Sequence, residues 1–400
     1  MVRRRRFLAA AGSGAAALAA AHGLPSGATQ TRKDAGAGPT VFRVWVAGCA
    51  HVGTDRRHGR ESLAHAIRQS EQAGPGGFAW DIALHLGDIA GSQGFPDEAE
   101  GREVVRQFAA LRTHRREQFY CLAGNHDADP DYAWHRTWVD PTGDHTARSG
   151  VDASRRPFPI AGTWERYAFR AGNLLFLMMS DRNDLEPPVG RGQAGARGGY
   201  PAGAVTGETF QWWRRSVEAD RDAVIVSAHH HMLKETTVGS GPWEGTGRPG
   251  PGGGPPKGVR RGKYAFAYHG YFPNGAPEGA SYLYFVDGKP DAGAFETHLA
   301  EHPGAIDLWL GGHTHTYPDD RLSGRTPIER KWGVTFINAC ALTRHHAGRS
   351  PMSRLLTFTD GSDAVRVQLV LHTDDFAPRG FADAYERTLR LGKPFRMATA

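Results

Sequence analysis

The sequence predicts an α/β fold, in which strands and helices alternate within one large domain. Short apolar runs of strand length alternate with longer segments that carry apolar residues at helical spacing. Polar motifs rich in histidine and aspartate directly follow several of the apolar runs. These motifs extend from Cys49 to His315, so neither half of the chain could form one site alone. We therefore predict a single domain over residues 40–375, followed by a tail over residues 376–400.

The first part of this domain is expected to contain strands that are separated by helices. The strands are predicted at residues 41–47, 82–86 and 118–122, and the helices at residues 60–73 and 98–113. Strands joined by helices in this way run parallel and end at the same edge of a sheet. Residues that follow these strands should therefore lie close together.

The second part begins with an expected hairpin and continues with a helix and further strands. These elements are predicted at residues 164–169, 173–179, 207–220, 223–226, 306–310, 333–338, 354–359 and 364–371. The chain after Asp374 has no clear pattern. Glycine and proline are frequent near residues 187–207 and 239–262, which excludes helices and central strands there. We interpret both stretches as insertions, either surface loops or flaps over the site.

The amino terminus is expected to be a processing segment. Arginines at positions 3–6 precede Phe7-Leu8 and an alanine-rich run, and the order R-R-x-F-L resembles a twin-arginine export signal. We predict that residues 1–28 are this signal peptide and that the protein is exported to the periplasm or the extracellular space. Elsewhere in the sequence, no stretch is apolar enough for long enough to span a membrane.

Charge and cysteine content exclude two classes of protein. The chain has 48 Lys and Arg against 42 Asp and Glu. Four of the arginines lie within residues 1–28, which leaves 44 basic against 42 acidic residues and argues against a dedicated nucleic-acid surface. Three cysteines, an odd number, do not form a disulfide scaffold. Cys121 and Cys340 lie in apolar runs, so we expect them to be buried as small hydrophobic residues.

Four polar motifs each follow a run that is predicted as a strand. They are Gly87-Asp88, Gly124-Asn125-His126-Asp127, His229-His230-His231 and Gly312-His313-Thr314-His315. Glycine allows the backbone to turn sharply, so the polar side chains can converge just beyond the strand ends. Strand ends of this kind can build a two-metal site, which is the usual device for hydrolysing phosphate esters.

This ordered set of motifs resembles the calcineurin-like metallophosphoesterases. Their pattern is D-x-H, G-D, G-N-H-[DE], a histidine after a strand, and G-H-x-H, and the resemblance extends over residues 42–371. It implies a sandwich of two sheets flanked by helices, with ligands on loops at the carboxyl ends of strands. The first motif departs from the pattern, because Cys49-Ala50-His51 stands in place of Asp-x-His.

The resemblance implies two divalent or trivalent metal ions, either zinc, iron or manganese, that are bridged by Asp88. His51 and His315 would complete the coordination of the first metal. Cys49 has three interpretations: a thiolate ligand, a bystander, or a position whose missing carboxylate is supplied by Asp55. Thiolate ligation is preferred, because it keeps the negative charge of aspartate, and it would favour zinc or iron.

The second metal would be bound by Asn125 and His313 and by one further histidine. Family members usually have a proline after the histidine pair, and this proline is absent here. The register therefore leaves His229 and His230 as alternative ligands, with His230 preferred.

The resemblance also implies that His126 is a general acid that protonates the leaving group, or else stabilises charge on the phosphoryl oxygens. Asp127 would orient the loop. The predicted function is an exported phosphoesterase that cleaves a phosphomonoester or phosphodiester by attack of metal-bound hydroxide. The alternatives are a non-catalytic or single-metal binding protein on the same scaffold, motivated by Cys49, and a secreted nuclease.

Overall fold

The computed structural model describes residues 40–55, 61–92, 94–184, 203–241, 282–290, 293–321, 324–344, 351–373 and 378–398. The predicted signal peptide, residues 1–28, lies outside the described residues, and so do most of both glycine- and proline-rich stretches. Among the described residues, no helix has both the length and the apolar character needed to cross a bilayer.

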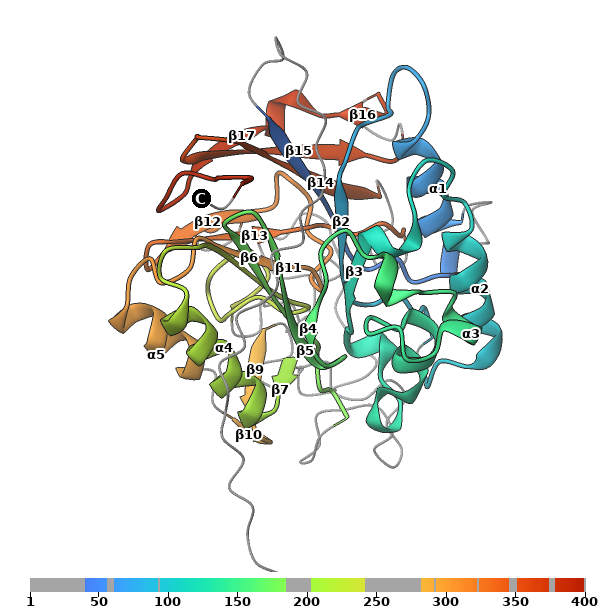
Figure 1. Cartoon of the computed structure of the whole chain (residues 1–400), viewed down its shortest axis with the longest axis horizontal. Coiled ribbons are helices and arrows are strands. Elements are labelled where there is room, and N and C mark those ends of the chain that lie inside the picture. Colours follow the sequence, from blue (N-terminus) through green and yellow to red (C-terminus); the bar gives the residue numbers. More distant parts are fainter. Residues whose placement is uncertain are drawn as a thin grey trace, which may run out of the picture.

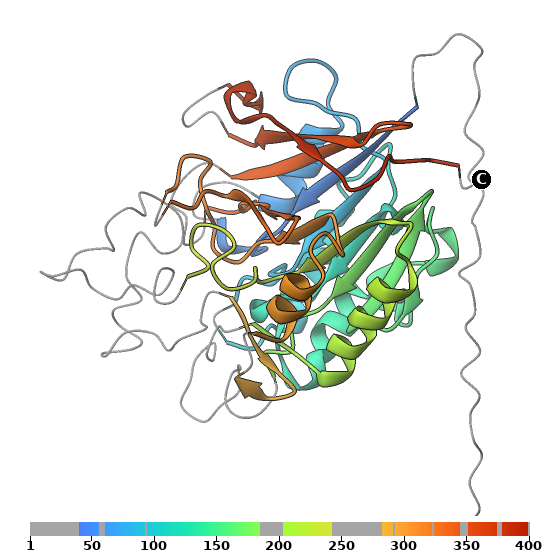
Figure 2. The same ribbon diagram turned by 90° about the vertical axis from the view of Figure 1, so that its left-hand side faces the viewer.

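Two large mixed sheets face each other and form the body of the molecule (Figures 1 and 2). The first sheet has the order β16 (Gly380–Phe381), β15 (Ala364–Leu371), β14 (Met352–Thr359), β1 (Val41–Ala47), β2 (Ile82–Leu86) and β3 (Phe119–Leu122), and β17 (Arg387–Arg390) also pairs with β15. Strands β1, β2 and β3 are parallel, so their carboxyl ends share one edge.

The second sheet is built in the same way around parallel strands. Its order is β12 (Ile328–Lys331), β13 (Val334–Asn338), β11 (Leu308–Gly311), β8 (Val224–His229), β6 (Leu174–Met179), β5 (Arg166–Ala171) and β4 (Ala161–Gly162). Strands β6, β8, β11 and β13 are parallel. A small third sheet contains β10 (Lys289–Pro290), β9 (Leu283–Val286) and β7 (Gly203–Val205).

Helices cover the outer faces of the two sheets (Figure 1). The first sheet carries α1 (Ser62–Ser70) and α2 (Glu98–Phe108), with α3 (Thr146–Ser149) beside them; the second carries α4 (Gly207–Ala219) and α5 (Gly293–Glu301). Single turns of 3-10 or π helix occur at η2 (Arg116–Gln118), η3 (Asn125–Asp127), η4 (Pro130–Tyr132), η5 (His135–Val139), η6 (Ala153–Arg155) and η7 (Asp383–Tyr385).

The main core lies between the two sheets, because every second side chain of the central strands points into that space. In β1, Val44 and Val46 belong to the core between the sheets, whereas Trp45 packs in the cluster formed with α1 and α2. Successive side chains of a strand point to opposite faces, so a strand between two packed layers is apolar on both. Cys121 and Cys340 are buried and unpaired, as predicted.

The predicted two-sheet α/β sandwich with flanking helices is confirmed. The tail is an exception to the sequence prediction, because β17 joins the first sheet and Phe395 packs against Phe42 and Phe358. Its strand was missed because β17 is a charged edge strand without an apolar run. Residues 203–205 form β7, although they lie within the first predicted insertion.

Candidate metal centre

The predicted motifs converge where parallel strands of both sheets end. The loop after β1 contacts the loop after β2, since the Cys49 N–H donates to the Gly87 carbonyl at 2.9 Å. A Cβ on Gly87 would lie 2.5 Å from the backbone nitrogen of Gly124, so the loops after β2 and β3 also touch. From the second sheet, the Gly312 N–H donates to the His230 carbonyl at 2.8 Å. These contacts place the strand-end loops side by side.

Several residues of these loops have a left-handed backbone conformation, which residues other than glycine rarely adopt. They are Cys49 (φ 51°), His51 (φ 41°), Asp88 (φ 56°), His313 (φ 62°) and His315 (φ 47°). Each such conformation costs about 1–3 kcal/mol, and residues of this kind cluster at functional sites. The backbone strain coincides with the predicted ligand positions, so the loops hold these side chains in fixed directions.

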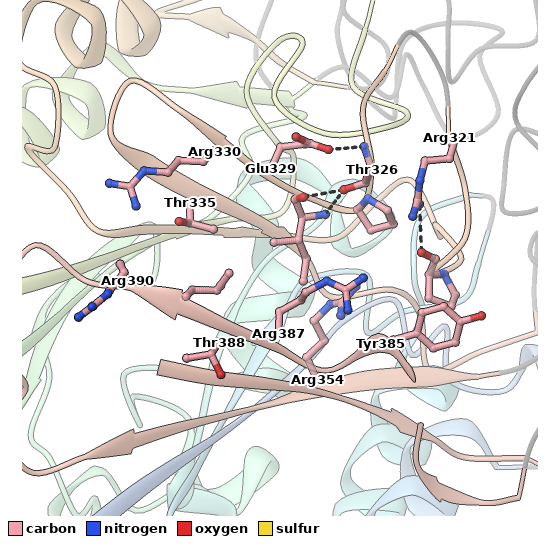
Figure 3. Close-up of a pocket in the computed structure, with 14 residues that line it drawn as sticks. Arg321, Thr326, Glu329, Arg330, Thr335, Arg354, Tyr385, Arg387, Thr388 and Arg390 are labelled. Carbon is pink, nitrogen blue, oxygen red and sulfur yellow. Dashed lines mark hydrogen bonds between the residues drawn. The ribbon is translucent and has the colours of Figure 1, made fainter. Parts of the chain in front are cut away.

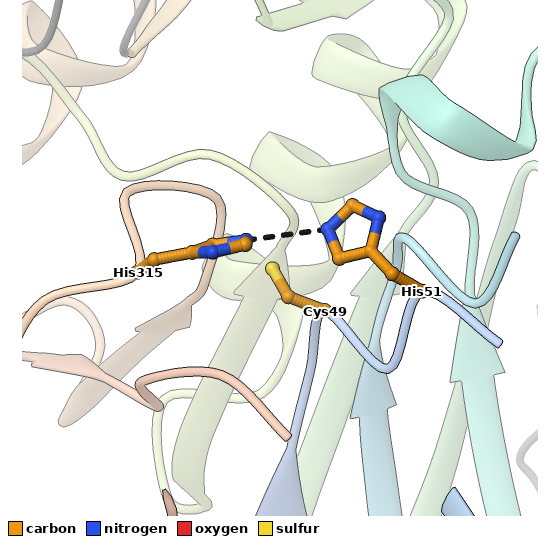
Figure 4. A group of neighbouring side chains, drawn as sticks. All are labelled: Cys49, His51 and His315. Atoms are coloured by element: carbon orange, nitrogen blue, oxygen red, sulfur yellow. Dashed lines mark hydrogen bonds between the residues drawn. The ribbon is translucent and has the colours of Figure 1, made fainter. Parts of the chain in front are cut away.

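A first cluster contains Cys49, His51 and His315, which are all buried (Figure 4). Their ligand atoms lie within 4.8 Å of one another, and the two imidazole Nε2 atoms are 3.2 Å apart. Two nitrogen ligands at about 2.1 Å from a tetrahedral ion are separated by about 3.4 Å. The Cys49 sulfur therefore occupies the position of a third ligand in a geometry that suits one metal ion.

A second cluster contains His230, His231 and His313, and Asp88 lies between the two clusters. Asp88 Oδ2 is 3.2 Å from His230 Nε2 and 3.6 Å from His51 Nε2. His313 Nδ1 is 3.3 Å from His230 Nε2. One carboxylate oxygen thus faces a histidine of each cluster, which is the position required of a bridging ligand.

Asp88 is suited electrostatically to this bridging position. Burial raises the pKa of Asp88, but the facing imidazoles of His230, His126 and His51 outweigh burial and hold the pKa well below its usual range. Apart from the facing imidazoles of His230 and His51, its buried Oδ2 atom has no hydrogen-bond partner among the described residues. The amide oxygen of Asn125 is also buried and has none among them. Buried oxygens without hydrogen bonds are costly, and a metal ion would satisfy both.

The structure distinguishes the two alternative histidines by their contacts. His230 shares a hydrogen bond of 2.6 Å between its Nδ1 atom and the Leu86 carbonyl, which leaves Nε2 directed at Asp88. His229 instead accepts from the His231 N–H at 3.0 Å, and its Nε2 lies 3.9 Å from Asp181. The geometry therefore places His230, and not His229, beside the Asp88 carboxylate.

His126 and Asp127 belong to the same loop but have different contacts. The His126 Nδ1 atom is 2.8 Å from the Ser92 carbonyl, and its ring meets the His51 ring edge to face at 4.5 Å. Its backbone N–H donates to Asp88 Oδ1 at 2.7 Å. This buried side chain lies beside the first cluster, and its ligand atom lies within 4.8 Å of those of His51 and Asp88.

Asp127 connects two loops through backbone hydrogen bonds. Its carboxylate accepts from the N–H groups of Asp88 (2.9 Å), Ala90 (2.8 Å) and Gly124 (2.8 Å). Burial, together with the charge of Asp88, raises the pKa of Asp127 to about 7, although the N–H donors oppose the shift. These contacts are those expected of a residue that orients the loops.

Asp55 is engaged away from the first cluster. Its carboxylate accepts from the Thr343 hydroxyl at 2.9 Å and from the Arg344 N–H at 3.0 Å. The carboxylate therefore ties the loop after β1 to the loop after β13. Of the residues considered for the first motif, Cys49 lies in the first cluster, whereas these hydrogen bonds hold the Asp55 carboxylate at the loop after β13.

Asp181 and His231 were not among the predicted site residues. Asp181 lies two residues after the end of β6. Its N–H donates to the Ala123 carbonyl at 3.0 Å, and burial raises the pKa of its carboxyl group well above the usual value. A sequence signal existed for Asp181, because it follows a predicted strand just as Asp88 does. His231 belongs to a predicted motif, but its place in the second cluster depends on the turn after β8.

A family profile described as calcineurin-like phosphoesterase matches residues 42–317 of the chain. Among solved structures, the chain is similar to GAP50, the anchor in the inner membrane complex of Plasmodium, at 9% identity, covering 88% of this chain and 90% of that one, with a TM-score of 0.42. It is also similar to Vps29 of Cryptosporidium parvum (10% identity, 88% and 98% covered, TM-score 0.29) and of Chaetomium thermophilum (9%, 88% and 100%, 0.30). No curated protein matches it.

Proposed function

Because the chain belongs to the calcineurin-like phosphoesterase family, we propose that it hydrolyses a phosphomonoester or phosphodiester at a two-metal centre. The observation that carries this proposal is the position of Asp88, whose Oδ2 atom faces His51 on one side and His230 on the other. When bound, two such ions supply an activated water nucleophile and neutralise the phosphate charge.

The side chains divide into two ligand sets that share Asp88. Cys49, His51 and His315 would hold the first ion, and they come from loops of both sheets. The second would be held by Asn125, His230 and His313, and the ligand atom of His231 lies within 4.8 Å of those of the two histidines. Thiolate and imidazole ligands favour zinc or iron, whereas the carboxylate and amide oxygens also suit manganese.

His126 is the proposed proton donor in this reaction. It lies beside His51 and is assigned to neither proposed ligand set, so we expect it to protonate the leaving oxygen as the ester bond breaks. Asp127 is a positioning residue, because it fixes the backbone of the loops that carry Asp88 and His126.

Metal analysis combined with an ester screen tests the proposal. The purified protein is expected to contain two transition-metal ions per chain and to hydrolyse an aryl phosphomonoester, an aryl phosphodiester, or both. A single ion per chain with no hydrolysis of either ester would favour the alternative of a binding protein, which Cys49 motivates. Binding of DNA that weakens steeply with salt, together with its cleavage, would identify a nuclease instead.

The role of Cys49 gives a prediction of its own. We expect Cys49→Ser to lower the affinity for the first metal ion by about 10–100-fold, because a neutral hydroxyl replaces a thiolate. Cys49→Asp restores a charged ligand and should improve the binding of manganese. Metal stoichiometry of the three proteins measures this effect. The buried Cys121→Ser is the matched control.

Alkylation of Cys49 gives an independent measurement. A thiolate that is bound to metal should be protected, and it should react after chelation. Equal alkylation in both states, with unchanged metal content in Cys49→Ser, would identify Cys49 as a bystander.

Export through the twin-arginine route is also part of the proposal, and it is supported by the order Arg4-Arg5-Arg6-Phe7-Leu8. Replacing Arg4 and Arg5 by lysine is expected to leave unprocessed precursor in the cytoplasm. Immunoblots of cell fractions measure this, with Arg32→Lys as the control outside the signal. Undiminished processed protein beyond the membrane would contradict the assignment.

A further inference from the structure

A basic cavity lies between the edges of the two sheets, away from the metal ligands (Figure 3). Its volume is about 360 Å³. Its walls come from β12, β13 and the loop before β12, from β14 and β17 of the first sheet, and from the 3-10 turn η7. The charged residues that line it are Arg321, Arg330, Arg354, Arg387, Arg390 and Glu329. None of the predicted metal ligands contributes to this lining.

Arg354 forms the floor of the cavity and is only 2% exposed. Its Nε atom donates to the Asn338 carbonyl at 2.6 Å, and its Nη2 atom lies 3.9 Å from the Cys340 sulfur. Within the described part of the chain, no carboxylate lies at ion-pair distance from this guanidinium. Burial lowers the pKa of Arg354, and the charge of Arg387 lowers it further. A buried charge without a counter-ion is strongly unfavourable, so an anion at this point would be stabilising.

The rim of the cavity adds positive charge that is mostly not neutralised. Arg387 donates to the Ala384 and Glu386 carbonyls, and Arg321 donates to the Pro318 and Asp320 carbonyls. Backbone carbonyls orient these guanidinium groups without cancelling their charge. Arg390 differs, because it forms an ion pair with Asp363.

The side chains of Arg354 and Arg387 lie together in the middle of the cavity, with Arg321 and Tyr385 at one end (Figure 3). Two neighbouring guanidinium groups repel each other unless an anion lies between them. The planar fork of arginine matches two oxygens of a phosphate group, which makes arginine pairs typical of phosphate recognition. The cavity volume also exceeds that of a phosphate ion and leaves room for a small organic group.

We propose that this cavity is a second anion site, in which Arg354 and Arg387 bind the phosphate group of inorganic phosphate or of a small organic phosphate. The site is separate from the metal centre and does not depend on the proposed hydrolysis. Arg387 is the better residue for a test, because Arg354 also supports the metal loop. It does so through Asn338, whose Nδ2 donates to Gly312 and Thr314.

Equilibrium dialysis with radiolabelled inorganic phosphate tests the proposal on the purified protein, before and after metal chelation. Chelation removes phosphate that is bound through metals, so the phosphate retained afterwards reports on the cavity. We expect about one phosphate per chain to be retained, and Arg387→Gln to weaken its binding by at least about tenfold. Arg102→Gln is the matched control, because Arg102 is an exposed arginine of α2 that pairs with Glu98.

Competition in the chelated protein distinguishes the two sources of phosphate. A sugar phosphate that displaces the label much better than unlabelled phosphate would identify an organic ligand, and equal displacement would identify recognition of the phosphate group alone; both support the site. The proposal is overturned if the chelated protein retains no phosphate or if Arg387→Gln binds as tightly as the unchanged protein. Absence of ester hydrolysis would contradict the proposed function only.

Discussion

Replacing Asp88 by asparagine is expected to abolish ester hydrolysis and to leave at most one tightly bound metal per chain. The amide keeps the size of the side chain but removes the negative charge that faces His51 and His230. No other described carboxylate faces both histidines, so neither cluster can compensate for the change. Metal analysis and turnover of an aryl phosphate measure the two effects.

A matched control separates this effect from a general loss of structure. Asp222→Asn makes the same chemical change at an exposed position after α4, and it should leave metal content and turnover unchanged. Retention of two metals and of more than a tenth of the activity in Asp88→Asn would show that Asp88 does not bridge two ions.

Replacing His126 by alanine is expected to lower the turnover of an alkyl ester by about 10²–10⁴-fold while both metals stay bound. The side chain contacts Ser92 and the His51 ring but belongs to neither proposed ligand set. Aryl esters have better leaving groups and need less protonation, so their loss should be clearly smaller. The measurement is the ratio of alkyl to aryl turnover together with metal content.

The exposed His302→Ala is the corresponding control and should change neither quantity. Equal losses for alkyl and aryl esters would exclude proton donation by His126. Loss of metal in His126→Ala would instead indicate that this imidazole supports the first cluster.

The central strands could be predicted because their neighbours dictate their composition. A strand such as β2 is covered on both faces, so it is an uninterrupted buried run that ends at Gly87, where the chain must turn. The edge strand β17 is charged and exposed on most positions, and only its pairing with β15 defines it. Local composition therefore predicts the interior of the sheets and misses their edges.

The sequence predicted the site as a set of motifs, but only the structure shows which side chains of each motif lie together. His229 ends β8 and turns towards Asp181, whereas His230 lies just beyond the strand and contacts Asp88. If β8 ended one residue later, the side-chain directions of His229 and His230 would be exchanged, and the sequence alone does not determine where a strand ends. Asp55 shows the same limit, because its hydrogen bonds to Thr343 and Arg344 arise from a loop distant in sequence.

The proposed ligand sets are divided between the two sheets, and this division has a thermodynamic consequence. Cys49, His51 and Asp88 follow strands of the first sheet, whereas His230 and His315 follow strands of the second. An ion held by ligands from both sheets acts as a cross-link across the main core. Folding and metal loading are then linked by mass action, since the unfolded chain cannot hold these ligands together. The midpoint of thermal unfolding should therefore rise with free metal concentration, and metal scarcity should first loosen the edge at which the two sheets meet.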